Sequence, residues 1–152
     1  MPDETVTRAM LVTILYRQAG SPTVGDTDPG FTDVAENAWY YDAVIWAYEN
    51  GATTGITATE FAPDQAVTRQ QMVTFLYRAA GEPAVTSGYG ENAPADTDSV
   101  AAYAADAMAW AYENQIIKGE DGLLKPEQNA TRAQIANIFM RFEKSLALAS
   151  EM

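Results

Sequence analysis

Apolar residues recur at helical spacing in five segments of the chain. The clearest stripe, Met72, Val73, Leu76 and Ala80, ends at Gly81, because glycine accepts the left-handed conformation that terminates helices. The other stripes are Leu11, Val12, Leu15 and Ala19; Tyr40, Val44, Ala47 and Tyr48; a near copy of the latter around Trp110; and Ile135, Ala136 and Phe139. The pattern predicts an all-α fold of five main helices, with at most short extended pairs in loops.

An internal repeat orders these segments. Residues 2–24 and 63–85 share 14 identities in 23 positions without a gap. Residues 126–132 begin a third, more divergent copy. A second unit starts at residue 31. Its later part, residues 42–50, recurs at residues 106–114. Each repeat therefore has two halves, and each half predicts one helix.

The two halves predict the organisation of the domain. The chain contains the second half of repeat one (2–24), then repeat two (31–81) and repeat three (94–146). The connectors between them, 21–30 and 82–98, are rich in Gly, Pro, Ala and Asp. We expect the first half of repeat one to belong upstream of Met1. A lone helix pair cannot bury its apolar face, so the repeats should pack together in one domain spanning residues 1–152.

The amino-acid composition excludes several kinds of catalytic site, metal site and binding partner. The chain has no histidine and no cysteine, which excludes Cys/His zinc sites, Ser-His and Cys-His catalytic pairs, and disulfides. Nine basic and 21 acidic residues give a net charge of −12, which repels nucleic acid and anionic membranes. No apolar run approaches the roughly 20 residues that span a bilayer. We expect no cofactor, no nucleic-acid partner and no membrane insertion, and an anionic ligand must be bound locally.

A Thr-Arg pair opens each of the three second-half helices. Threonine followed three residues later by glutamine forms a capping box, which satisfies backbone N–H groups at the helix start. Thr68 with Gln71 and Thr131 with Gln134 fit this pattern, whereas the first copy has Met10 at the glutamine position. Capping explains the threonine and leaves the arginine unexplained.

The arginines of these pairs are Arg8, Arg69 and Arg132. The helix dipole favours acidic residues at this position and opposes a cation. A guanidinium beside free backbone N–H groups can bind a carboxylate or phosphate in bidentate geometry. The residues themselves leave two interpretations, a ligand site and an inter-repeat salt bridge.

Taken together, these motifs resemble the S-layer homology (SLH) repeat of bacterial cell-surface proteins. The resemblance covers nearly the whole chain. It rests on Phe-Thr-Asp-Val at 31–34, Trp-Tyr at 39–40, Asp-Ala-Val-Ile-Trp-Ala-Tyr-Glu-Asn-Gly at 42–51, Phe-Ala-Pro-Asp at 61–64 and Val-Thr-Arg at 67–69. The Ile-Thr-Arg-Ala-Glu signature of the family corresponds to 6–10, 67–71 and 130–134, with the arginine kept in all three copies and the glutamate in none.

The resemblance implies a pseudo-threefold array of helix-loop-helix repeats. In this family the inter-repeat grooves bind secondary cell-wall polysaccharide, typically with pyruvylated sugars, and so tether exported proteins to the bacterial cell wall without a covalent bond. A pyruvyl carboxylate suits a fixed guanidinium. The implied glycan-binding pairs are Thr7 and Arg8, Thr68 and Arg69, and Thr131 and Arg132. The implied location is extracellular, at the cell wall or S-layer surface.

The resemblance also implies further groove residues. They are an aromatic after the Asp-Val turn (Trp39 and Tyr103), acceptors (Asp33 and Asp96), and glycines that allow close approach (Gly55 and Gly119). An aromatic at a helix start is also common in a core, and Trp46 and Trp110 are interpreted as core residues.

The grooves depend on which repeats are neighbours. If a groove needs the Thr-Arg turn of one repeat beside the aromatic turn of the next, the pairs are Arg8 with Trp39 and Arg69 with Tyr103. Arg132 then lacks its neighbour unless the missing half-repeat supplies it.

Two other chemistries compete with a glycan groove. Asp26 with Asp28, and Asp96 with Asp98, resemble the start of a calcium loop, but no glutamate follows at the twelfth position and solvated turns are favoured. Paired carboxylates could hydrolyse glycosides, but no acidic residue lies in a repeated apolar setting. We predict no metal site and no catalytic residues, and hence a non-enzymatic anchoring module. The alternative is an interaction module that forms a homodimer or docks an upstream half-repeat through its incomplete repeat.

Overall fold

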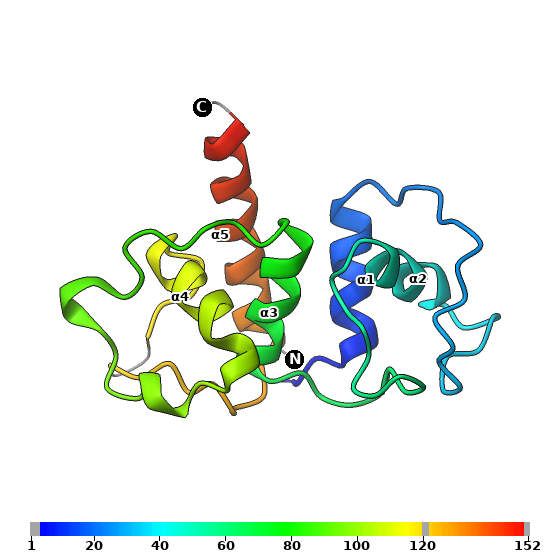
Figure 1. Cartoon of the computed structure of the whole chain (residues 1–152), viewed down its shortest axis with the longest axis horizontal. Helices are drawn as coiled ribbons and strands as arrows, with labels where there is room; N and C mark the ends of the chain where they lie inside the picture. Colours follow the sequence, from blue (N-terminus) through cyan, green and yellow to red (C-terminus); the bar gives the residue numbers. More distant parts are fainter. Residues whose placement is uncertain (1–3, 120–121, 151–152) are drawn as a thin grey trace.

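The computed structural model describes residues 4–119 and 122–150. Within them lie the five predicted α-helices, α1 (Arg8–Gln18), α2 (Tyr41–Glu49), α3 (Arg69–Ala79), α4 (Ala105–Glu113) and α5 (Arg132–Ser150) (Figure 1). Three short 3₁₀ turns, η1 (Gly90–Asn92), η2 (Thr97–Ser99) and η3 (Ala102–Ala104), precede α4. Extended pairing among the described residues is limited to isolated bridges. The all-α prediction is confirmed.

A ring of backbone hydrogen bonds joins the three repeats. Val67 N donates to Val6 O (2.8 Å), Ala130 N donates to Val67 O (2.9 Å), and Val6 N donates to Ala130 O (3.2 Å). These residues precede the three Thr-Arg pairs and are at most 1% exposed. The closed ring gives the second halves a pseudo-threefold arrangement, so each of α1, α3 and α5 starts at an equivalent place.

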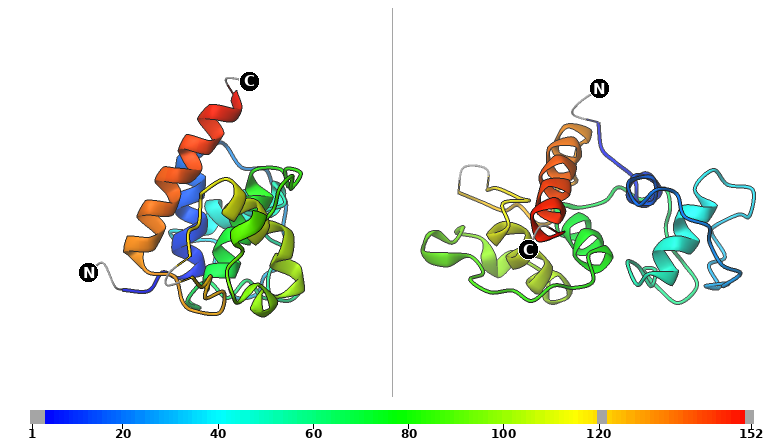
Figure 2. Two further views of the ribbon diagram at one scale, coloured as in Figure 1. Left: turned by 90° about the vertical axis from the view of Figure 1, so that its left-hand side faces the viewer. Right: turned by 90° about the horizontal axis from the view of Figure 1, so that it is seen from above.

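The helices pair between neighbouring repeats. Helix α1 packs on α2 and α3 packs on α4, with equivalent aromatic contacts between Tyr16 and Trp46 (5.8 Å between centroids) and between Tyr77 and Trp110 (5.4 Å). Figures 1 and 2 show α2 beside α1 and α4 beside α3. Both tryptophans therefore contribute to packing, as their sequence setting indicates.

Helix α5 differs from its two equivalents. Its apolar face, Ile135, Ile138, Phe139 and Phe142, is buried in the core shared with the other repeats. Its opposite face lacks a covering helix in the described structure, and Met140, the positional equivalent of Tyr16 and Tyr77, is 63% exposed. No helix in the described ranges is long and apolar enough to cross a membrane.

Candidate functional site

The three threonines of the Thr-Arg pairs cap their helices. Thr68 and Gln71 form a complete capping box, with Thr68 N donating to Gln71 Oε1 (2.9 Å) and Gln71 N donating to Thr68 Oγ1 (3.2 Å). Thr131 and Gln134 make the same two bonds. Among the described residues, the Thr7 hydroxyl accepts only from the backbone N–H of the third helical residue, as its sequence predicts. The threonine hydroxyls therefore serve the helix starts.

The Arg8 side chain is buried between repeats one and two. The residue is 4% exposed, and its Nε donates to the carbonyl oxygen of Phe61 at 2.8 Å. The rings of Phe61 and Phe75 lie 4.9 and 5.1 Å from its guanidinium carbon, within cation–π range. Burial lowers the pKa of Arg8, against opposing effects of Tyr103 and Asp33, yet an arginine remains charged. The guanidinium is thus held rigidly.

The other two arginines differ from each other. Arg69 is 2% exposed, and its Nε donates to the carbonyl oxygen of Leu124 at 2.8 Å, the repeat-equivalent of the bond that Arg8 makes. Arg132 has a half-exposed side chain, and its Nε lies 3.7 Å from Oε2 of Glu4. The salt-bridge interpretation therefore describes Arg132, whose pair is solvent-exposed, and does not describe Arg8.

The predicted acceptors Asp33 and Asp96 hold turns of their own repeats. Asp96 accepts from Leu124 N (2.7 Å) and Lys125 N (2.9 Å). Asp33 makes the equivalent pair of bonds with the backbone N–H groups of residues 61 and 62, at 2.9 and 2.8 Å. Each carboxylate thereby fixes the turn whose carbonyl oxygen accepts the hydrogen bond from an arginine Nε. The two aspartates therefore help to position Arg8 and Arg69.

One pocket of about 300 Å³ gathers residues from all three repeats. It is lined by Arg8 of repeat one, Gly55 of repeat two and Tyr103 of repeat three. Tyr103 is 52% exposed, and burial raises its pKa despite the opposing effect of Arg8 and Arg78, so its hydroxyl is protonated at neutral pH. Three sequence-predicted residues therefore meet here.

Among the lining residues that the sequence did not predict are two polar ones on α3, Gln71 and Arg78. Arg78 is half-buried and makes no side-chain hydrogen bond or ion pair with the described residues. We call this site the two-arginine pocket, after Arg8 and Arg78. An arginine recurs nine positions after the arginine of each Thr-Arg pair, as Arg17, Arg78 and Arg141. This recurrence could have indicated Arg78 from the sequence, but only the fold shows that this copy reaches the pocket.

The remaining predicted residues lie elsewhere. Trp39 is 65% exposed and contacts Tyr40 edge-on, with 5.0 Å between ring centroids, and it does not line the pocket with Arg8. Gly119 borders a separate shallow hollow together with Tyr112. The expected pairing of Arg8 with Trp39 is thus replaced by Arg8 with Tyr103, because the pocket reaches across to the third repeat.

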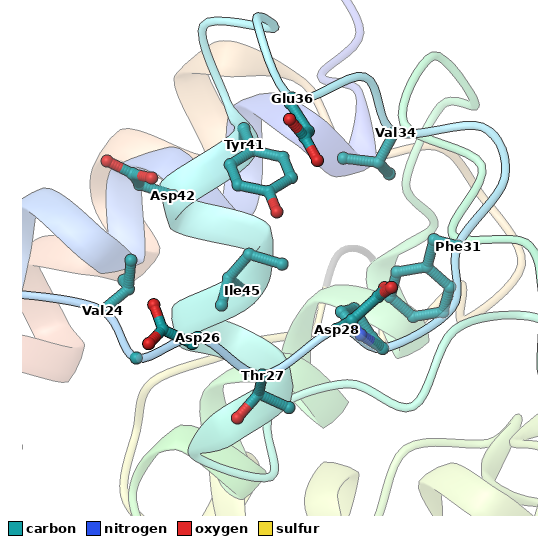
Figure 3. A pocket seen from close by; sticks show the side chains of 12 residues that line it. Val24, Asp26, Thr27, Asp28, Phe31, Val34, Glu36, Tyr41, Asp42 and Ile45 are labelled. Atoms are coloured by element: carbon teal, nitrogen blue, oxygen red, sulfur yellow. The ribbon is translucent and has the colours of Figure 1, made fainter.

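A larger hollow of about 540 Å³ lies beside α2 and is acidic (Figure 3). Asp26, Asp28, Glu36 and Asp42 line it, and Asp28 accepts from Gly30 N at 2.9 Å. No group of three or more metal-ligating side chains occurs among the residues that the structure describes. The described lining of this hollow therefore offers no cation to an acidic ligand.

The fold and the pocket define a repeat-built, all-α binding domain. A family model described as the S-layer homology domain matches residues 30–73 and 95–136, which together make up more than half of the chain. The chain belongs to the S-layer homology domain family. This membership places it outside the bacterial cell, at the cell wall, in a family of wall-anchoring domains.

Curated relatives carry the same region within much longer proteins. The chain is 34% identical over 140 residues to an endoglucanase of Bacillus sp. (strain KSM-635), covering 90% of this chain and 15% of that protein. It is 34% identical over 145 residues to the surface-layer 125 kDa protein of Lysinibacillus sphaericus, covering 92% and 12%. It is 30% identical over 142 residues to the exoglucanase XynX of Acetivibrio thermocellus, covering 90% and 13%. The chain therefore spans a small part of these relatives.

Proposed function

We propose that the chain binds an acidic secondary cell-wall polysaccharide through the two-arginine pocket and so anchors a surface protein without a covalent bond. The observation that carries this proposal is the charge of the pocket. In a chain of net charge −12, its described lining holds two arginines and no acidic side chain. A pyruvylated sugar presents a carboxylate that suits such a pocket.

The chemistry of the lining supports a sugar acid as ligand. Nε is the only side-chain atom of Arg8 with a protein hydrogen bond in the described part of the chain, so both terminal amino groups remain for a carboxylate. Charge-assisted bonds of this kind contribute roughly 1.5–3 kcal/mol each. Tyr103 adds an exposed aromatic face and Thr54 an exposed hydroxyl, which suit the apolar and polar sides of a sugar ring.

We also propose that the module itself is not catalytic. Glycoside hydrolysis needs a pair of carboxyl groups flanking the bond, and the two-arginine pocket has none in its described lining. The endoglucanase and exoglucanase relatives share only 15% and 13% of their length with this chain. Their activities belong to proteins with much additional sequence.

A sacculus pull-down with matched variants tests the anchoring proposal. The chain should sediment with isolated sacculi and should stay in solution once the secondary polysaccharide has been extracted. Tyr103→Ala should lose at least about tenfold in retention, whereas Trp39→Ala, at the corresponding exposed position of repeat two, should keep it. Retention by polymer-free peptidoglycan, or equal loss in both variants, would contradict the proposed site.

A second candidate function rests on the exposed face of α5. Ala133, Ala136 and Asn137 are exposed, whereas the equivalent positions of α1 and α3 are buried. The buried equivalents are Ala9, Val12 and Thr13 in α1, and Gln70, Val73 and Thr74 in α3. We propose that this face, with Met140, binds a first-half helix of the α2 or α4 type from another segment.

Peptide binding tests this second candidate. A synthetic peptide of residues 31–50, which contains the α2 sequence, should bind the chain in calorimetry. Met140→Glu should abolish that binding because it places a charge on the apolar face, and Gln18→Glu, at an exposed position of α1, should leave it unchanged. Equal binding by both variants would remove α5 as the docking face.

A further inference from the structure

The two arginines of the two-arginine pocket are held in different ways. Arg8 is fixed from behind by Phe61 O and flanked by two phenyl rings. Arg78 lies about two and a half helical turns along α3 from the helix start, and its side chain makes no hydrogen bond or ion pair among the described residues. Both line the pocket with Tyr103, and both oppose the rise in the pKa of Tyr103 that burial causes. The pocket therefore presents two separate cationic groups to one volume.

Gln71 keeps this volume free of negative charge. Its Oε1 accepts from Thr68 N and its backbone N–H donates to Thr68 Oγ1. Glutamate would serve equally well in a capping box, so helix capping does not select the amide. With glutamine, the side-chain NH₂ adds a donor to the lining, where a carboxylate would neutralise one arginine.

We propose that the two-arginine pocket takes a ligand unit with two acidic groups, one bound by Arg8 and one by Arg78, and that Gln71 permits this by keeping a carboxylate out. That the ligand unit belongs to a glycan rests on the proposed function. Asp33 acts on Arg8 from outside the pocket lining, so a single acidic group bound at Arg8 would leave Arg78 without a counter-charge in a lining that has no carboxylate. Two acidic groups neutralise both.

Titrations followed by ¹⁵N NMR on the full chain test this inference without cell walls. The probes are galacturonate with one acid, digalacturonate and galactarate with two acids at different spacings, and cellobiose with none, all at one ionic strength. We expect at least one diacid to bind about tenfold more tightly than galacturonate, with shifts at Gly55, Gln71 and Tyr103. That ratio corresponds to one additional charge-assisted interaction.

Matched variants separate the two arginines. Arg78→Gln should reduce the diacid preference to about twofold, and Gln71→Glu should do the same while retaining the capping box. Arg17→Gln and Gln134→Glu make the same changes at the equivalent positions of α1 and α5, outside the pocket lining, and should keep the full preference.

Each outcome decides the inference. If neither diacid exceeds galacturonate in the unaltered chain, if no acid shifts the pocket resonances, or if Arg78→Gln keeps the preference, the inference is overturned. The inference is supported if the diacid preference is lost in Arg78→Gln and Gln71→Glu and is kept in Arg17→Gln and Gln134→Glu. Sacculus retention of the unaltered chain reports separately on anchoring. Retention that does not change in Arg78→Gln would therefore leave the proposed function standing and refute the second acidic group.

Discussion

Nε of Arg8 donates a 2.8 Å hydrogen bond to the carbonyl oxygen of Phe61, which belongs to the next repeat. Arg69 repeats this relationship with Leu124 at 2.8 Å. In both cases the accepting turn is itself fixed by an aspartate from its own repeat. The arginine of one repeat is thus hydrogen-bonded to a turn of the next repeat. Because Arg8 also lines the two-arginine pocket, packing between repeats helps to set the geometry of that pocket.

This relationship predicts different stability effects at equivalent arginines. Arg8→Lys removes the Nε donor and leaves the buried Phe61 carbonyl without it, so the free energy of unfolding should fall by about 2 kcal/mol. Arg132→Lys alters an exposed pair with Glu4 and should cost less than about 1 kcal/mol. Urea unfolding at pH 7 measures both values. Similar losses in the two variants would show that the inter-repeat bond does not stabilise the fold.

Gly55 is predicted to be required by the turn that borders the pocket. Its φ is +89°, and a Cβ there would lie 2.6 Å from Thr57 O and 2.7 Å from Glu60 O. Gly55→Ala should therefore reduce the free energy of unfolding by about 3 kcal/mol or more, from strain and clash together.

Gly51→Ala supplies the control for this clash. Gly51 also has a positive φ (+75°), but nothing lies within 4 Å of its Cβ position. The cost should be about 1 kcal/mol, which is the conformational part alone. Thermal unfolding of both variants separates the two contributions, and equal melting temperatures would argue against the clash.

The sequence allowed the helices and the repeat to be predicted because both depend on local patterns. Apolar spacing located α3, and the capping box located its first turn at Thr68. The sequence also marked Arg8 as unusual, since a cation at a helix start opposes the local dipole preference, and in the structure Arg8 bonds to the neighbouring repeat. These inferences needed no knowledge of which repeats touch.

The composition of the pocket could not be predicted in the same way. The resemblance to the family assigns Trp39 and Tyr103 to corresponding places, but the choice between them depends on how the repeats close into a ring. In the structure Tyr103 completes the pocket of Arg8, and Arg78 enters from a helix face that the sequence assigns to no partner. The roles of Asp33 and Asp96 were hidden for a related reason, because their backbone partners lie 28 and 29 residues away.

Asp96 should make stability depend on acid pH. Desolvation alone would raise its pKa, but hydrogen bonds from the backbone N–H groups of Leu124 and Lys125, with the charge of Arg69, outweigh it and hold the pKa below the ordinary value. A carboxyl whose folded-state pKa is depressed stabilises the native state above its unfolded-state pKa, near 4, and this contribution is lost as pH falls through the folded-state pKa. The unaltered chain should therefore lose stability below about pH 4.

Asp96→Asn tests this link between one carboxylate and the turn that it holds. The amide can accept one of the two backbone bonds but turns a donor toward the other N–H, so the loss at pH 7 should be about 2 kcal/mol. The difference from the unaltered chain should shrink as pH falls below 4, because protonation removes the same charge. Asp98→Asn, at an exposed side chain with no described partner, should follow the unaltered curve throughout. Urea unfolding between pH 3 and 7 measures all three, and a gap that stays constant with pH would show that the charge of Asp96 does not hold the turn.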